Sequence, residues 1–195
     1  MHIRARCFAL FTMLLLTSAA TQAQVRIVAL GDSNIAGKGV STSQAYPAQL
    51  EAALRARGLD VTVSNAGING NTTADVLSRL DRAVPDGTDF VIYSVGINDL
   101  FAGVSAEKMK QNFAEIGQRL KSRGIPWLAF GPNQVLGPFQ GDIEGRADLH
   151  VEAPGQQRNL YHLNEAGYTI IVKRTMPKIF PMVKKIADAK KKQRG

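Results

Sequence analysis

The chain contains little of several residue types that define special classes of protein. Among its 195 residues there is one cysteine, Cys7, so a small scaffold held together by disulfides is excluded. The 18 glycines follow no fixed period, which excludes a collagen-like repeat. Hydrophobic residues make up 45% and charged residues 21%, an ordinary globular balance that argues against disorder. A chain of this length buries one substantial core, which predicts one domain.

Residues that bind metals or nucleic acids are also scarce. After residue 23 there are two histidines, His150 and His162, and they lack the paired spacing of metal ligands. The stretch Gly37-Lys38-Gly39 does not have the spacing of a phosphate-binding loop. The body of the chain offers no face of mixed basic and aromatic residues, which argues against nucleic-acid binding. The sequence therefore implies no metal, no cofactor and no nucleic-acid partner.

The first 23 residues have the pattern of a secretory signal peptide. Two arginines form a basic start, and a mostly apolar stretch from Cys7 to Leu16 follows them. The stretch Thr21-Gln22-Ala23 resembles a cleavage site, so we expect the mature chain to begin near Gln24. An uncleaved membrane anchor is the alternative interpretation. We expect a periplasmic or secreted protein, which cleavage would leave without cysteine.

The formal net charge of +8 is concentrated at the C-terminus. From Lys184 to Gly195, six cationic residues stand against one acid, Asp188, which gives this segment a net charge of +5. Residues 24–183 carry only +1 once the two arginines of the signal are set aside. We expect residues 24–183 to form the folded domain and residues 184–195 to form a basic tail. The tail is either a frayed, solvated end or a weak contact with an anionic surface.

Strands and helices are expected to alternate along the chain. Short apolar and β-branched runs predict strands, and apolar residues three or four positions apart predict helices. The expected strands are Val25–Leu30, Leu59–Ser64, Phe90–Val95 and Ile125–Phe130. The expected helices are Ala45–Arg57, Thr72–Val84, Ser105–Arg123 and Asn164 to about Ala189, the last bent or split at Pro177 and Pro181. Strands of this apolar kind between helices predict an α/β fold with a parallel sheet covered on both faces.

Polar, tightly turning clusters follow the first three expected strands. They are Gly31-Asp32-Ser33-Asn34, Asn65-Ala66-Gly67-Ile68-Asn69-Gly70 and Gly96-Ile97-Asn98-Asp99. The carboxyl ends of parallel strands share one edge of the sheet, beyond which ligands bind, so we expect the clusters to meet there. A fourth cluster, from Tyr161 to Tyr168, stands at the start of the last helix. Each cluster alone is a weak signal, but their order along the chain is specific.

In this order the clusters resemble the four sequence blocks of the GDSL or SGNH hydrolases. The resemblance runs from about Val25 to Tyr168. In that family the blocks carry a nucleophilic serine, glycine and asparagine oxyanion donors, and a histidine. The matching residues are Ser33, Gly67, Asn98 and His162. The resemblance implies a three-layer, flavodoxin-like (SGNH-type) sandwich with a central parallel sheet, and ester hydrolysis without a cofactor.

The same residue types make chemical sense for acyl transfer, which needs a nucleophile, a base and donors for the oxyanion. Ser33 is expected at a strand-to-helix turn, and His162 is expected to accept its proton, whereas His150 is interpreted as an ordinary loop or strand residue. The N–H groups of Ser33 and Gly67 and the side-chain amide of Asn98 are the candidate oxyanion donors. Gly67 suits this role because an absent Cβ lets an acyl group approach the backbone.

One position departs from the family pattern of Asp-X-X-His, because Asn159 stands three residues before His162. An asparagine can accept from the ring N–H but brings no charge, and in the serine proteases this change lowers kcat about 10⁴-fold. Three interpretations stay open. The enzyme works as a dyad with Asn159 or a backbone carbonyl orienting the ring, or another acid such as Asp148 or Glu152 serves His162, or the site binds a ligand without turnover.

The sequence thus predicts a serine esterase that acts on a small-molecule, glycan or lipid ester. Asp32 and Asp99 are expected to stabilise turns rather than to take part in the chemistry. Two other functions remain as alternatives: a non-catalytic module that binds acylated glycans or lipids, and a surface-adhesion protein that acts through its basic tail. Neither the acyl group, the alcohol nor the oligomeric state is indicated.

Overall fold

The structure, a computed structural model, describes residues 24–130, 146–149, 151 and 162–193. The expected signal peptide lies outside these ranges, as do His150, Glu152 and Asn159. Within the described ranges, no helix is both long enough and apolar enough to cross a membrane.

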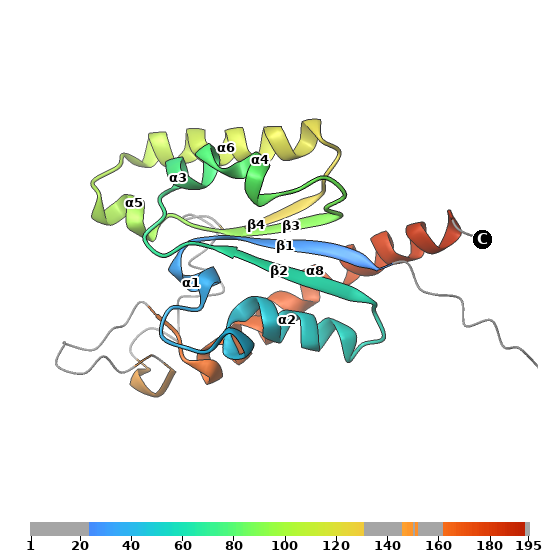
Figure 1. Cartoon of the computed structure of the whole chain (residues 1–195). Helices are drawn as coiled ribbons and strands as arrows, with labels where there is room; N and C mark the ends of the chain where they lie inside the picture. The colour runs from blue at the N-terminus through green and yellow to red at the C-terminus, as the bar shows by residue number, and fades with distance from the viewer. Residues whose placement is uncertain (1–23, 131–145, 150, 152–161, 194–195) are drawn as a thin grey trace, which may run out of the picture.

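A parallel sheet of four strands forms the centre of the molecule (Figure 1). The strands are β1 (Val25–Gly31), β2 (Val61–Gly67), β3 (Phe90–Ser94) and β4 (Trp127–Phe130). They lie in the order β2-β1-β3-β4, with both neighbours parallel to β1. This is the strand order of a flavodoxin-like, doubly wound sheet. The predicted α/β fold with a central parallel sheet is confirmed.

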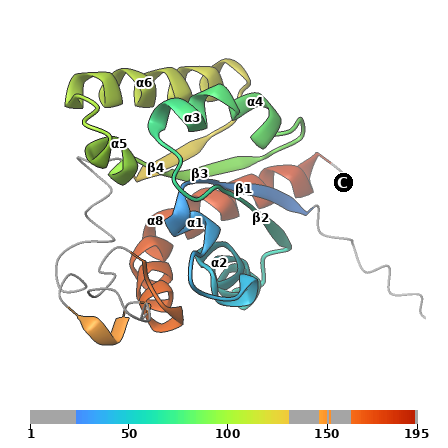
Figure 2. The same ribbon diagram turned by 60° about the vertical axis from the view of Figure 1, so that its left-hand side comes forward.

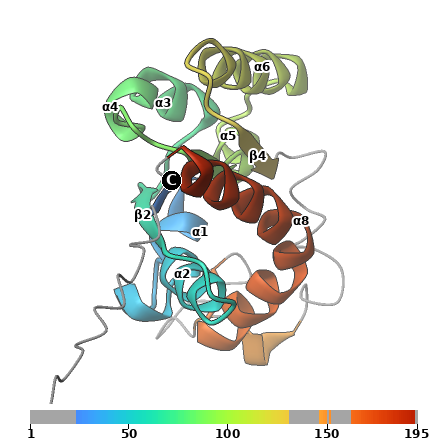
Figure 3. The ribbon, with the colours of Figure 1, turned by 90° about the vertical axis from the view of Figure 1, so that its right-hand side faces the viewer.

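Helices cover both faces of this sheet and complete three layers (Figures 1 and 3). One face is covered by α2 (Tyr46–Arg55) and α8 (Glu165–Lys192). The other is covered by α3 (Thr73–Ser78), α4 (Leu80–Ala83) and α6 (Ala106–Ser122). Two short helices, α1 (Ser33–Ala36) and α5 (Ile97–Phe101), follow β1 and β3 at the carboxyl edge of the sheet (Figure 2). Two 3-10 turns are also present, at Thr42–Gln44 and Ala147–Leu149.

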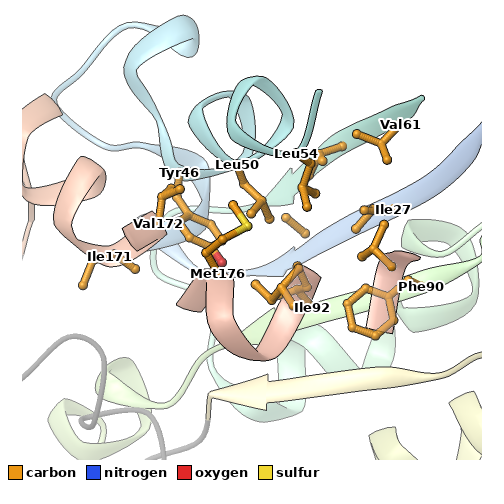
Figure 4. Close-up of a cluster of buried hydrophobic side chains, with 14 of the residues drawn as sticks. Ile27, Tyr46, Leu50, Leu54, Val61, Phe90, Ile92, Ile171, Val172 and Met176 are labelled. Carbon is orange, nitrogen blue, oxygen red and sulfur yellow. The ribbon is translucent and has the colours of Figure 1, made fainter. Parts of the chain in front are cut away.

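Alternation along the strands divides the hydrophobic core into two clusters. In β1, Ile27 and Ala29 belong to the cluster beneath α2 and α8, which Figure 4 shows in close-up. Val28 and Leu30 belong to the cluster on the side of α3 and α6. Successive side chains of a strand point to opposite faces, and here both faces are covered. Apart from the exposed Arg26, the strand is therefore apolar, which is the feature that made it recognisable in the sequence.

The expected helix over residues 72–84 is two helices in the structure. α3 ends at Ser78, Arg79 adopts φ −107° and ψ 7°, and α4 begins at Leu80. The Arg79 side chain bonds to Asn71 and Gly31, which lie beneath the break. The helix is thus interrupted at Arg79, although the helical spacing of apolar residues continues through this position.

α8 is one helix of 28 residues, although it contains Pro177 and Pro181. A proline removes one backbone donor and usually kinks or ends a helix. Here the buried face of α8, which includes Ile179 and Val183, continues past both prolines into the core. Burial of that apolar face stabilises the helix more than the lost hydrogen bonds weaken it.

α8 also contains most of the segment expected to be a basic tail, through Lys192. Ala187 is buried against the domain, and Lys190 Nζ lies 2.5 Å from Asp89 Oδ2 and 3.0 Å from the carbonyl oxygen of Gln24. Asp89 and Gln24 directly precede β3 and β1. Through residue 192, this segment is therefore a helix held against the amino edge of the sheet rather than a frayed end (Figure 3).

Candidate active site

Ser33 and His162 meet at the carboxyl edge of the sheet. The His162 Nε2 atom lies 2.9 Å from Ser33 Oγ, a hydrogen-bond distance, although the two residues are 129 positions apart in the chain. Ser33 is the first residue of α1, directly after β1, and only 5% of its surface is exposed. The structure thus brings together the two residues that the sequence assigned to nucleophile and base.

Asp32 holds the turn that presents Ser33. Its Oδ1 atom accepts from the backbone N–H of Asn34 at 2.9 Å and so caps α1. Burial is the main cause that raises the pKa of Asp32 to about 6, and the nearby Asp99 carboxyl adds to it. The backbone bonds that this carboxyl accepts, first among them the one from Asn34, oppose the rise. Asp32 therefore stabilises the turn, as the sequence analysis expected.

Backbone hydrogen bonds hold the segment that carries His162. Its carbonyl oxygen accepts from the N–H of Val151 at 3.0 Å, and two residues later the N–H of Asn164 donates to the Leu149 carbonyl at 3.0 Å. The Asn164 side chain then caps α8 by accepting from the N–H of Gly167 at 3.0 Å. These bonds hold His162 and Asn164 in place directly before α8.

The environment of His162 favours its neutral form. Partial burial lowers the pKa of the imidazole, and the positive charge of Lys38 lowers it further. A neutral ring can accept the proton of a serine hydroxyl, whereas an imidazolium cannot. At neutral pH the ring is therefore in the state that a general base requires.

Two of the three expected oxyanion donors have an N–H that bonds to no other described residue. The N–H of Ser33 makes no hydrogen bond among the described residues, because it belongs to the first turn of α1. The Asn98 side-chain amide donates to the carbonyl oxygen of Asn71 at 2.9 Å, which orients the amide and leaves its second N–H for a ligand. Both donors come from the ends of neighbouring strands.

Gly67 is held differently from the expectation. Its N–H donates to Asn65 Oδ1 at 3.0 Å, within its own strand. A Cβ at this position would lie 2.1 Å from the backbone nitrogen of Ala36, so the missing side chain makes room for α1. The structure thus gives Gly67 a packing reason to be glycine, and its role as an oxyanion donor stays a prediction.

Gly70 is a second candidate for a backbone donor, and the sequence reasoning missed it. It lies in the turn after β2 with φ 80°, and a Cβ there would meet nothing within 4 Å. Its N–H makes no hydrogen bond in the part of the chain that the structure describes. The next residue, Asn71, accepts the Asn98 amide. The sequence signal was present, because Gly70 ends the polar cluster after the second strand.

Asp99 stabilises a turn behind the site. It is fully buried and accepts from both the N–H of Thr73, at 2.8 Å, and the Thr73 hydroxyl, at 2.5 Å. Asn112 of α6 donates to the same hydroxyl at 2.8 Å. This network ties α5, α3 and α6 together, which agrees with the structural role expected for Asp99.

Of the three residues considered as partners of His162, the structure describes Asp148 but not Glu152 or Asn159. Asp148 is described and exposed, and both of its carboxylate oxygens bind Arg146, at 2.8 and 2.6 Å. Glu152 and Asn159 lie outside the described residues. No group of three or more histidine, cysteine, aspartate or glutamate residues suited to a metal ion occurs in the described ranges.

Solved structures with this arrangement of sheet and helices define the class of the fold. A crystal structure of TesA covers 80% of this chain and 99% of its own, with a TM-score of 0.66 and 24% sequence identity. AlinE4, described as an esterase of the SGNH-hydrolase family, covers 80% of this chain and 95% of its own, with a TM-score of 0.57 and 28% identity. The fold is that of the SGNH hydrolases.

Sequence comparison places the chain more closely. The model of the GDSL-like lipase/acylhydrolase family matches residues 29–154, and the chain belongs to this family. An arylesterase of Vibrio mimicus is 35% identical over 108 residues, which cover 55% of this chain and 54% of that protein. Esterase TesA of Pseudomonas aeruginosa is 34% identical over 126 residues, which cover 64% of this chain and 60% of that protein. The alignments thus span little more than half the length of these relatives.

Proposed function

We propose that the protein is an exported serine hydrolase that cleaves carboxylic esters through an acyl-enzyme. The observation that carries this proposal is the 2.9 Å separation of Ser33 Oγ and His162 Nε2 in a chain of the GDSL-like family. The names of two relatives, an arylesterase and an esterase, support the same reaction class. The substrate is an ester of a small molecule, a glycan or a lipid.

The reaction follows from the roles of these groups. Ser33 Oγ attacks the ester carbonyl carbon while His162 Nε2 takes its proton, which gives a tetrahedral oxyanion. The Ser33 N–H, the Asn98 amide and a backbone N–H of the turn after β2, from Gly67 or Gly70, donate to that oxyanion. When the intermediate collapses, the leaving alcohol takes the proton from His162. Water then attacks the acyl-enzyme by the same steps and releases the acid.

We propose that the imidazole works in a dyad oriented by Asn159 or a backbone carbonyl. Asp148 already binds Arg146 through both of its carboxylate oxygens, so it would have to share its charge between Arg146 and the ring.

Restoring a carboxylate tests this assignment. In Asn159→Asp we expect kcat for p-nitrophenyl acetate to rise, because a carboxylate stabilises the imidazolium formed during attack. The charge also raises the pKa of His162, by about 1 unit or more, so the acid limb of kcat/KM moves to higher pH. Glu152→Gln is the matched control and is expected to change neither quantity. A limb that moves only in Glu152→Gln would make Glu152 the partner of His162.

The reaction class itself is tested without knowledge of the substrate. A fluorophosphonate reacts with an activated serine, so intact mass is expected to show one adduct on the mature protein and none on Ser33→Ala. The same spectrum reports whether residues 1–23 have been removed. Folded protein without an adduct would contradict the proposal and favour a module that binds acylated ligands without turnover.

A further inference from the structure

Arg79 occupies an unusual position for an arginine. It lies between α3 and α4, and only 9% of its surface is exposed. Its Nη2 atom donates to the Gly31 carbonyl at 2.9 Å, and its Nε atom donates to Asn71 Oδ1 at 2.7 Å. Long cationic side chains are seldom buried unless they are paired, so the buried position of Arg79 needs an explanation.

The two partners of Arg79 are the last residue of β1 and a residue of the loop after β2. Gly31 is the last residue of β1, two positions before Ser33, and its carbonyl also accepts from the N–H of Ile68 at 3.0 Å. Asn71 accepts the Asn98 amide on its backbone oxygen. Arg79 therefore contacts the residue that accepts the Asn98 amide, and it contacts the residue two positions before Ser33.

The charges around Arg79 differ from those of a structural ion pair. No carboxylate lies within 4.0 Å of its guanidinium in the described part of the chain, and both acceptors are neutral oxygens. Burial is the main cause that lowers the pKa of Arg79; the positive charge of Arg82 lowers it further, and the Asp75 carboxylate opposes that change. The planar guanidinium group can donate to two acceptors at once in a fixed geometry, which the ammonium group of a lysine cannot do.

We propose that Arg79 is a positioning residue for the reaction: it orients Asn71, and through it the Asn98 amide, toward the oxyanion. This inference rests on the proposed ester hydrolysis. Arg79 touches no reacting atom, so removing it moves the amide without deleting it. A misplacement of about 1 Å can lower a rate roughly 100-fold, so Arg79→Gln is expected to lower kcat roughly 10- to 100-fold with little change in KM.

A double-mutant cycle tests the path through Asn98, with p-nitrophenyl acetate as substrate. In an Asn98→Ala background, Arg79→Gln is expected to change kcat less than about threefold, because the amide that it positions is gone. Arg79→Lys is expected to recover part of the lost kcat, since one of the two bonds can form. Equal losses from Arg79→Gln in both backgrounds would overturn the proposal.

Arg123 provides a matched control. It is partly buried, it donates to the Val84 carbonyl at 2.6 Å, and it lies beside the far end of α4. Arg123→Gln is expected to lower Tm without changing kcat. If Arg79→Gln behaves like Arg123→Gln, or if neither Arg79 variant folds, Arg79 is a structural clamp and the proposal is wrong. Failure of the ester hydrolase assignment is recognised separately, by wild-type protein that takes no fluorophosphonate.

Discussion

Replacing His162 with alanine is expected to lower kcat for p-nitrophenyl acetate about 10⁴- to 10⁶-fold. The imidazole, 2.9 Å from Ser33 Oγ, is the group placed to take the serine proton, and loss of the base in a serine hydrolase removes nearly all of its covalent catalysis. Fluorophosphonate labelling is expected to slow in parallel, because it depends on the same nucleophile. Steady-state kinetics and timed intact-mass measurements read the two effects.

The pH profile separates this role from a general loss of structure. Wild-type kcat/KM is expected to fall as pH falls through the pKa of His162, because the imidazolium cannot accept a proton. Since burial and Lys38 lower that pKa, the limb lies below pH ~6.5, the ordinary value for histidine. The residual activity of His162→Ala is expected to lack the limb. A limb that persists in this variant would point to Asp32, whose pKa is about 6.

Replacing Asn98 with alanine is expected to lower kcat about 10²- to 10³-fold, the usual effect of removing one oxyanion donor. The loss in folding stability is small, because the amide makes one bond, to the Asn71 carbonyl, worth about 1 kcal/mol. Kinetics and thermal unfolding of the same preparation measure the two effects. The expected signature is a large change in kcat with a small change in Tm.

Asn112→Ala is the matched control for that variant. Asn112 is buried, and its amide donates to Thr73 Oγ1 at 2.8 Å, away from the nucleophile. Its replacement leaves a buried hydroxyl with one partner fewer, so Tm falls more than in Asn98→Ala while kcat is largely kept. If Asn98→Ala keeps kcat within about threefold of wild type, Asn98 is not an oxyanion donor.

Local pattern predicted the architecture well because the sheet is parallel and covered on both faces. β3 is buried along its whole length and β1 is buried except at Arg26, so both are largely apolar and stand out in the sequence. The two short helices at the carboxyl edge were not predicted. α1 has four residues and α5 has five, so neither is long enough to show a helical period.

One helical prediction was wrong because of a contact that a local pattern does not contain. The helix expected over residues 72–84 divides at Arg79, whose side chain bonds to the Gly31 carbonyl, 48 positions away, and to Asn71 in the loop after β2. The two prolines of α8 predicted a bend or a split, and the structure has one helix that continues across both of them. Packing of its buried face stabilises that continuity, which local propensity alone does not indicate.

By itself, the sequence determined the alternation of strands and helices and the polar clusters at the strand ends, since these depend on residues close together in the chain. Only the tertiary structure decided that Ser33 and His162, 129 positions apart, lie within hydrogen-bond distance. It also decided that Gly67 makes room for α1 and that Arg79 joins the end of β1 to the loop after β2. The physical reason is that packing marks which residues are buried but does not mark which distant side chains meet, because that depends on how the layers fit together.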